Sequence, residues 1–228
     1  MEQTRHMAVA LDGPSAAGKS TLARAAARRF GFLYVDTGAI YRSVGLAACR
    51  AGIDPKDTAA VMELLPGLRI DMAYDERGVQ RMLLDGEDVS EEIRRPEISL
   101  YASDVSAHPE VRAFLMEMQR DLARRHSVVM DGRDIGTVVL PDAELKVFLT
   151  ASAAARARRR WLELREKGIE TDPEEVRRDI AYRDQQDTRR AAAPLRPAED
   201  AVFLDTSELS LEQSVEALCG LIREAMER

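Results

Sequence analysis

One stretch, Met7 to Thr21, constrains the fold of this chain more than any other. It opens with a short apolar run of strand length, and an alanine-rich helical pattern, Thr21 to Arg29, follows it. The residues between them match the phosphate-loop pattern G-x-x-x-x-G-K-S/T at every specified position: Gly13, Pro14, Ser15, Ala16, Ala17, Gly18, Lys19 and Ser20. Because strand, loop and helix stand in the order that such a loop requires, we predict a nucleoside triphosphate site here.

The chemistry of this loop depends on its backbone. Glycines allow successive N–H groups to wrap around phosphate oxygens, and the helix N-terminus adds the positive end of its dipole. Lys19 is expected along the β- and γ-phosphates, and the Ser20 hydroxyl is expected to reach a magnesium ion. The alternative is an ordinary glycine-rich turn that matches the pattern by chance.

Composition limits the function classes only broadly. A chain of 228 residues can form one sizeable core with an insertion, and its net charge of −7 argues against a general nucleic-acid binder. Cys49 and Cys219 lie far apart among apolar residues, as expected for free thiols in a reducing compartment. Met1 to His6 is polar, and no later run reaches membrane-spanning length, so we predict a cytoplasmic protein. The histidines lack metal-ligand spacing: His6, His108 and His126.

A second strand is predicted over Phe32 to Val35, followed by a helix that opens at Asp36 and stops near Gly52. Thr37 fits the N-cap of this helix, a role that needs no ligand. Tyr41 and Arg42 lie one turn inside the helix, whose N-terminus points to the same sheet edge as the phosphate loop. Arg42 is therefore placed where it can hold a second phosphate group.

A small antiparallel patch interrupts this alternation of strands and helices. Leu68 to Leu84 has alternating apolar positions, with candidate hairpin turns at Arg77-Gly78 and Asp85-Gly86. We predict that this patch is an insertion into the core fold and not part of the parallel sheet. Pro96 to Arg125 then shows two helical patterns broken at His108-Pro109.

Another apolar run, Ser127 to Met130, is expected to be a buried strand that delivers Asp131 to Thr137 into a loop. An acidic group just past a strand is where the magnesium side of a phosphate-loop protein is expected, and Asp131 occupies that place. Asp131 and Asp134 as plain turn residues are the alternative.

The last third carries an arginine-rich region. A strand over Leu145 to Leu149 precedes a helix, Ala151 to Glu166, in which Arg156, Arg159 and Arg160 share one face. Such a face is usually solvated or paired with glutamates, but in a kinase a mobile lid can bring arginine charge over the γ-phosphate.

The next helix starts near Asp172, and on it Arg183, Asp187 and Arg190 fall on one stripe. A structural ion-pair ladder and a phosphate-binding or ribose-binding stripe explain this spacing equally well. A last strand, Ala201 to Leu204, and an amphipathic helix, Ser210 to Met226, are predicted to end the chain.

Taken together, the motifs resemble the bacterial cytidylate kinases, which phosphorylate CMP and dCMP from ATP. The resemblance covers nearly all of the chain after residue 7 and rests on these segments: GPSAAGKS from Gly13, DTGAIYRS from Asp36, GEDVSEEIR from Gly86, DGRDIGTVV from Asp131 and R-D-x-x-D-x-x-R from Arg183. Thr37 stands where many members have serine, and the hydroxyl is retained.

The resemblance implies a role for each matching position. Thr37, Arg42, Arg133 and Asp187 would contact the phosphate or sugar of CMP; Ser103, Arg112 and Asp134 would read cytosine; Arg183 and Arg190 would close on the phosphates. Tyr41 is added to the CMP site. Thr21 and Arg159 join the phosphate loop in the ATP site. Lys19, Asp131, Arg183 and Arg190 are the predicted catalytic residues, and Ser20 the predicted magnesium ligand.

The expected fold is an α/β phosphate-loop sheet flanked by helices. Its core would comprise residues 1–66, 96–150 and 195–228, with a monophosphate-side insertion over 67–95 and a short lid with the following helix over 151–194. The expected reaction is magnesium-dependent transfer from ATP to CMP or dCMP by a monomer that binds no nucleic-acid polymer and no membrane. The alternatives are a kinase for UMP, AMP or a metabolite alcohol, and an ATP-binding regulatory module.

Overall fold

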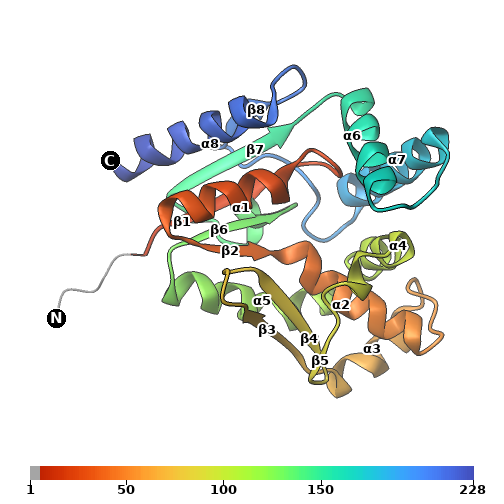
Figure 1. The fold of residues 1–228 in the computed structure, drawn as a ribbon. Helices are drawn as coiled ribbons and strands as arrows, with labels where there is room; N and C mark the ends of the chain where they lie inside the picture. Colours follow the sequence, from red (N-terminus) through yellow and green to blue (C-terminus); the bar gives the residue numbers. More distant parts are fainter. Residues whose placement is uncertain (1–5) are drawn as a thin grey trace.

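The computed structural model describes residues 6–228; residues 1–5, which hold most of the predicted polar segment Met1 to His6, lie outside the described part. At the centre is a five-stranded parallel sheet with the order β2-β6-β1-β7-β8 (Figure 1). Its strands are β1 (Ala8–Asp12), β2 (Leu33–Asp36), β6 (Val128–Gly132), β7 (Leu145–Thr150) and β8 (Val202–Asp205). Because β1 lies between β6 and β7, the loop that follows it emerges at the sheet edge where ligands bind in such folds.

Helices cover both faces of the sheet, as expected for parallel strands with apolar runs. Val9 and Leu11 of β1 belong to one hydrophobic core, and Ala10 between them belongs to another on the opposite face. The first face is covered by α1 (Lys19–Phe30) and α8 (Leu211–Met226), and the second by α5 (Pro109–Arg125) and the π-helical turn η3 (Ile135–Val139).

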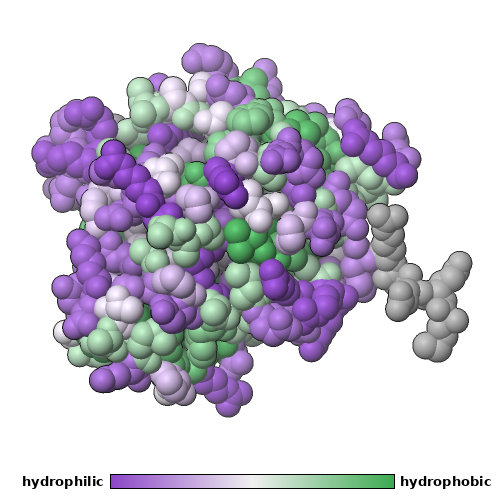
Figure 2. All heavy atoms as spheres, turned by 180° about the vertical axis from the view of Figure 1, so that it is seen from behind, coloured by the Kyte–Doolittle hydropathy of each residue, from purple (hydrophilic) through white to green (hydrophobic). Residues whose placement is uncertain are grey.

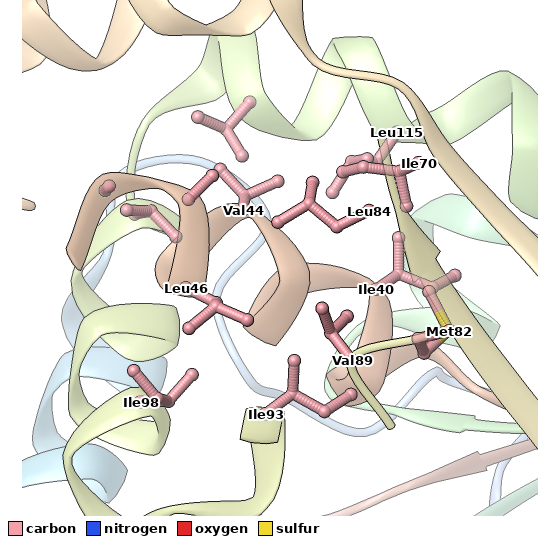
Figure 3. Close-up of a cluster of buried hydrophobic side chains, with 14 of the residues drawn as sticks. Ile40, Val44, Leu46, Ile70, Met82, Leu84, Val89, Ile93, Ile98 and Leu115 are labelled. Atoms are coloured by element: carbon pink, nitrogen blue, oxygen red, sulfur yellow. The ribbon is translucent and has the colours of Figure 1, made fainter. Parts of the chain in front are cut away.

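A second region of the structure is built around α2 (Thr37–Arg50), which packs on α4 (Pro96–Val105) and on a small antiparallel sheet. That sheet and its connections comprise β3 (Ile70–Tyr74), β4 (Gln80–Leu84), β5 (Glu87–Asp88), α3 (Thr58–Leu64), η1 (Leu65–Gly67) and η2 (Glu92–Arg94). Figure 3 shows Ile40 and Val44 of α2 meeting Met82 and Leu84 of β4 in one apolar cluster. The insertion thus packs on α2 through a continuous hydrophobic core.

The region predicted to be the lid contains two helices beside the phosphate loop, α6 (Ala153–Glu166) and α7 (Pro173–Arg189). They pack on each other through their own small cluster of Leu164, Val176 and Ile180. Trp161 Nε1 of α6 donates to the carbonyl oxygen of Thr171, 3.2 Å away, and so ties down the connection between the helices.

The predicted helices, the predicted strands and both hairpin turns are confirmed to within a few residues, but two predictions are wrong. The segment Asp131 to Thr137 is not all loop, because β6 continues to Gly132 and η3 begins at Ile135.

The predicted cap of α2 is also wrong. Asp36 is the N-cap, because its Oδ1 accepts the Ala39 N–H at 2.9 Å while its own backbone is extended. Thr37 is the first helical residue, and its hydroxyl is free to donate elsewhere. The second turn, Asp85-Gly86, has positive φ at both residues, as a tight hairpin requires.

The surface agrees with the charged composition. The face shown in Figure 2 is mostly hydrophilic, with hydrophobic residues in small separate groups. Within residues 6–228, none of the helices has the length and apolar character needed to cross a bilayer.

Candidate active site

A cavity of about 920 Å³ opens beside the phosphate loop, between α2, α4 and the lid helices. It brings together residues that lie far apart in the sequence. Its lining includes most of the predicted site residues: Ala16, Ala17, Gly18, Lys19, Ser20, Thr21, Thr37, Tyr41, Arg42, Ser103, Arg112, Asp131, Arg133, Asp134, Arg159, Arg183, Asp187 and Arg190. Gly13, Pro14 and Ser15 are not among the lining residues; they form the base of the loop.

The base of the loop explains the first glycine of the motif. Gly13 has a φ of +154°, and a Cβ atom built there would lie 2.0 Å from the carbonyl oxygen of Leu149 in β7. Backbone cannot yield to such a contact, so only glycine fits. Helix α1 then begins at Lys19, directly after Gly18 in the left-handed conformation, and its N-terminus faces the cavity.

Lys19 folds back onto its own loop. Its Nζ donates to the carbonyl oxygens of Gly13 and Pro14, both at 2.8 Å. Burial, reinforced by the charge of Arg133, lowers the pKa of Lys19 to about 7. An anion beside this amino group would favour its charged form, so the loop is set up to take on negative charge.

Ser20 and Asp131 form the predicted metal side. The Ser20 hydroxyl donates to Asp131 Oδ2 at 2.9 Å, while Asp131 Oδ1 is buried without a hydrogen-bond partner in the described structure. Burial, together with the negative charge of Asp36, raises the pKa of Asp131 to about 6. A hydroxyl beside an under-partnered carboxylate is the oxygen donor set that Mg²⁺ takes, so these residues fit a magnesium ion.

The cavity wall that holds Arg42, Arg133 and Arg183 is strongly cationic. Arg42 Nη2 lies 2.8 Å from Asp36 Oδ2, and Arg133 Nε lies 2.6 Å from Asp187 Oδ2. Arg183 contributes a buried Nε without a hydrogen-bond partner among the described residues. Burial, with the charge of Arg133, lowers the pKa of Arg183 to about 10. Buried guanidiniums close enough for their charges to interact, one of them with an unpaired Nε, are suited to bind a phosphate group.

Thr37 connects the start of α2 to the strand β6 that carries Asp131. Its hydroxyl donates to the backbone carbonyl oxygen of Asp131 at 2.7 Å, and its side chain is almost fully buried. The family resemblance implies that Thr37 contacts the phosphate or sugar of CMP, and this role stays a prediction. The structure places Thr37 on the cavity wall, bonded to Asp131, which lies two residues before Arg133 in the chain.

A second polar cluster lies deeper, around Asp134. Its Oδ2 accepts a hydrogen bond from Arg112 Nη2, and its Oδ1 accepts one from Arg190 Nη2 at 3.1 Å. All three side chains are buried. Ser103 Oγ and Arg112 Nη1 remain without hydrogen-bond partners among the described residues, and the Arg112 guanidinium lies 5.5 Å from the Tyr41 ring centre. Unused donors and one carboxylate around an aromatic ring are suited to the polar edge of a heterocyclic base.

The predicted stripe on α7 does not form a simple ladder. Asp187 pairs with Arg133 from the β6 loop, and its nearest contact to Arg190 Nη1 is 4.0 Å. Arg190 instead turns to Asp134 and donates through Nε to the carbonyl oxygen of Ala193 at 2.6 Å. Its predicted contact with the transferred phosphate stays a prediction.

The lid arginines differ from one another. Arg159 donates to the Thr206 carbonyl oxygen at 2.5 Å and to the Thr206 hydroxyl at 3.1 Å, while Arg160 pairs with Glu163 at 2.9 Å. Sequence reasoning assigned no separate role to Arg156, which is buried and reaches the phosphate loop. Its place on the shared helix face with Arg159 was the only signal.

Sequence reasoning also assigned no role to Asp12, which the structure places behind the Asp134 loop. Its two carboxylate oxygens accept the N–H groups of Ile135 and Gly136, each at 2.8 Å, and so hold the turn that follows Asp134. Burial raises the pKa of Asp12 to about 6, although these N–H groups oppose the shift. The one signal in the sequence was that Asp12 stands directly before Gly13, the first glycine of the phosphate-loop motif.

Comparisons with known proteins agree with this geometry. A family profile described as cytidylate kinase matches residues 9–224. A cytidylate kinase from Caldicellulosiruptor bescii is 49% identical over 213 residues, which is 93% of this chain and 94% of that protein. One from Desulfitobacterium hafniense is 47% identical over 225 residues, with 98% and 95% covered.

A solved structure supports the fold independently. An uncharacterized protein from Eubacterium ventriosum aligns with a TM-score of 0.51 at 12% identity, over 98% of this chain and 100% of that one. The match of the family profile over nearly the whole chain decides the relationship: this chain belongs to the cytidylate kinase family.

Proposed function

We propose that this protein transfers the γ-phosphoryl group of ATP to a phosphate oxygen of CMP, forming CDP and ADP. Family membership supports the reaction, and one observation of the structure carries the assignment of the site. A single cavity joins the phosphate loop to a cationic wall and to the buried Asp134 cluster. That arrangement offers a place for a donor triphosphate, an acceptor phosphate and a base in succession.

The donor site comprises the phosphate loop from Gly13 to Thr21, with Arg159 beside it. N–H groups at the start of α1 and the Lys19 ammonium would surround the phosphates of ATP. Arg159 is anchored on Thr206 at the cavity wall, which holds its charge near the loop.

Ser20, with Asp131 next to it, would hold the magnesium ion that accompanies ATP. The orphaned Oδ1 of Asp131 is the observation that supports this choice. The ion would supply positive charge to the phosphate oxygens; the chain's own part is to orient the hydroxyl and the carboxylate toward it.

The acceptor site divides into two parts. Thr37, Arg42, Arg133 and Asp187 would hold the phosphate and sugar of CMP, and Arg183 lies close enough to Arg133 for their charges to interact. Ser103, Arg112 and Asp134, with Tyr41 beneath Arg112, would read the base. A carboxylate accepts from the N4 amino group of cytosine, and arginine donates to the ring acceptors.

Catalysis in this scheme rests on position and charge. The CMP phosphate is already a nucleophile at neutral pH, so no strong base is required; the enzyme must bring two polyanions in line and cancel their repulsion. Lys19, Arg183 and Arg190 are the proposed sources of that charge. The lid helices α6 and α7 would exclude water, which otherwise hydrolyses ATP.

Further parts of the proposal concern the assembly. We assign residues 67–95 to an acceptor-side insertion, 151–194 to the lid region, and the rest to the core. We also propose that dCMP is accepted, that the protein acts as a monomer, and that it works in the cytoplasm. The free thiols of Cys49 and Cys219 are in keeping with a reducing compartment.

The test is ADP release with a panel of acceptors at saturating ATP. CMP and dCMP are expected to give the fastest release, with UMP and AMP far behind. Equal rates for UMP or AMP would favour a kinase of other specificity. Release that does not depend on any acceptor would favour the regulatory ATP-binding module.

A further inference from the structure

Ser15, at the base of the phosphate loop, is held on every polar group by a residue from outside the loop. Its N–H donates to Asp184 Oδ1 at 2.9 Å, and its carbonyl oxygen accepts from Arg156 Nη1 at 2.9 Å. Its hydroxyl accepts from Arg133 Nη2 at 3.1 Å. The residue has no exposed surface, so these contacts are made without competition from water.

The two lid residues that bind Ser15 also bind each other. Arg156 Nη1 lies 2.5 Å from Asp184 Oδ2, and Arg156 Nε donates to the carbonyl oxygen of Ala151 at 3.1 Å. Arg156 comes from α6 and Asp184 from α7. A closed ring of hydrogen bonds therefore joins both lid helices to the backbone N–H and carbonyl oxygen of one residue of the phosphate loop.

The next residue shows why this peptide needs support. Ala16 has a φ of +58°, a left-handed conformation that residues with a Cβ atom rarely adopt. Such a conformation persists only where the surroundings hold it. Ala16 lines the cavity and Ser15 does not, so the ring holds the loop at the residue just before the loop reaches the cavity.

We propose that Asp184 and Arg156 are positioning residues that lock the Ser15 peptide and thereby shape the phosphate loop for ATP. This inference rests on the proposed function of the loop as the ATP site. Arg156 also compensates the negative charge that Asp184 brings beside the loop. Loss of either residue opens the ring that holds Ser15, so each change should weaken ATP binding more than CMP binding.

The variants are Asp184→Asn and Arg156→Lys, each kept close in size to the original residue. The Asn side chain can still accept the Ser15 N–H, but its amide cannot accept from Arg156 on the other side. Lys retains a charge but cannot donate to Ser15, Asp184 and Ala151 together. Glu174→Gln is the matched control, because Glu174 lies on the same helix as Asp184 and its carboxylate pairs, among residues 6–228, only with Arg177 at the surface.

Steady-state kinetics give the first readout. For each variant we expect the KM for ATP to rise about tenfold, the scale for one lost charge-assisted hydrogen bond. The KM for CMP should change by less than about threefold, and the Glu174→Gln control should match the wild type. A lowered melting temperature with an unchanged KM for ATP would mean that the ring is only structural and would overturn the inference.

Trp161 supplies a second readout that needs no turnover. It is the only tryptophan of the chain and lies on α6, so its fluorescence can follow the lid when ATP and Mg²⁺ are added without acceptor. We expect the dissociation constant for ATP to rise about tenfold in each single variant, and by much less than a hundredfold in the double variant, since both act through one ring. If the dissociation constant of the double variant rises about a hundredfold, the two residues act independently, and the inference that they act through one ring is overturned. A wild type that binds ATP but does not phosphorylate CMP would instead refute the proposed function.

Discussion

Lys19 lies with its amino nitrogen 2.8 Å from the carbonyl oxygen of Gly13, so the lysine of the phosphate loop is bonded to the loop itself. Its lowered pKa, about 7, follows mainly from burial. The side chain is therefore positioned before any nucleotide arrives, and binding of a polyanion needs only to turn the ammonium from carbonyl oxygens to phosphate oxygens.

Lys19→Ala should reduce turnover by at least ~10², the scale for one preorganised electrostatic contact. The melting temperature should stay close to that of the wild type, because the fold around the loop is set by its backbone. Lys56→Ala, at an exposed position, is the control with an expected full rate. Near-wild-type turnover in Lys19→Ala would remove this lysine from catalysis.

Arg183→Lys and Arg190→Lys should distinguish a role in phosphoryl transfer from a role in holding the folded structure together. Arg183 Nε has no hydrogen-bond partner among the described residues, so the replacement should cost little stability and lower turnover by about 10². Arg190 holds Asp134 and the Ala193 carbonyl oxygen, so its replacement should lower both turnover and melting temperature. Unaltered turnover in Arg183→Lys would contradict a role at the phosphates.

Asp131→Asn tests the metal side through stability. In the folded protein burial raises the pKa of Asp131 from 3.8 to about 6, so the folded state keeps its proton at a pH where the unfolded chain has lost it. This carboxyl therefore lowers stability as the pH rises between those values, and the penalty, on the order of 3 kcal/mol, is complete above them.

The variant lacks this penalty. Relative to wild type, Asp131→Asn should gain melting temperature on going from about pH 4 to about pH 8, measured without nucleotide or magnesium. It should also lose most of its turnover. A melting-temperature difference that does not change with pH would show that Asp131 is not held in the protonation state described here.

Gly13→Ala should destabilise the protein by about 1–3 kcal/mol or more, because the added methyl group meets the Leu149 carbonyl oxygen. Gly220→Ala is the matched change: that glycine lies within α8, and a Cβ there meets no atom within 4 Å. It should stabilise by about 0.5–1 kcal/mol through helix propensity. Thermal or denaturant unfolding measures both.

Much of the fold could be predicted because its signals are local. The apolar run before Gly13, the break at His108-Pro109 and the turn at Asp85-Gly86 each specify an element through neighbouring residues alone. The cap of α2 was misjudged because Asp36 and Thr37, both good capping residues, stand side by side. Only the extended backbone at the end of β2 selects Asp36.

The site was predicted less completely, because its key contacts cross the sequence. Ser15 and Asp184 are bonded across 169 positions, and Asp12 and Ile135 across 123. Spacing along α7 could place Asp187 and Arg190 on one stripe, but could not show that Asp187 turns to Arg133 and Arg190 to Asp134. Such pairings follow from the strand order, which no local pattern specifies.

The central claim is that the buried Asp134 carboxylate selects cytosine. Uracil carries an oxygen where cytosine carries the N4 amino group, so a carboxylate there leaves uracil unpaired, a mismatch that can reach several orders of magnitude in kcat/KM. Asp134→Asn places an amide, able to donate, in the same volume. The fold of the variant is checked by its melting temperature, because Arg112 and Arg190 lose a charged partner.

The most direct measurement is the ratio of kcat/KM for CMP to that for UMP, in wild type and in Asp134→Asn, at saturating ATP. The ratio cancels any general loss of activity. We predict a large ratio in the wild type and a ratio at least about tenfold smaller in the variant, as CMP use falls much more than UMP use. An unchanged ratio would contradict the account and leave Asp134 a structural partner of two arginines.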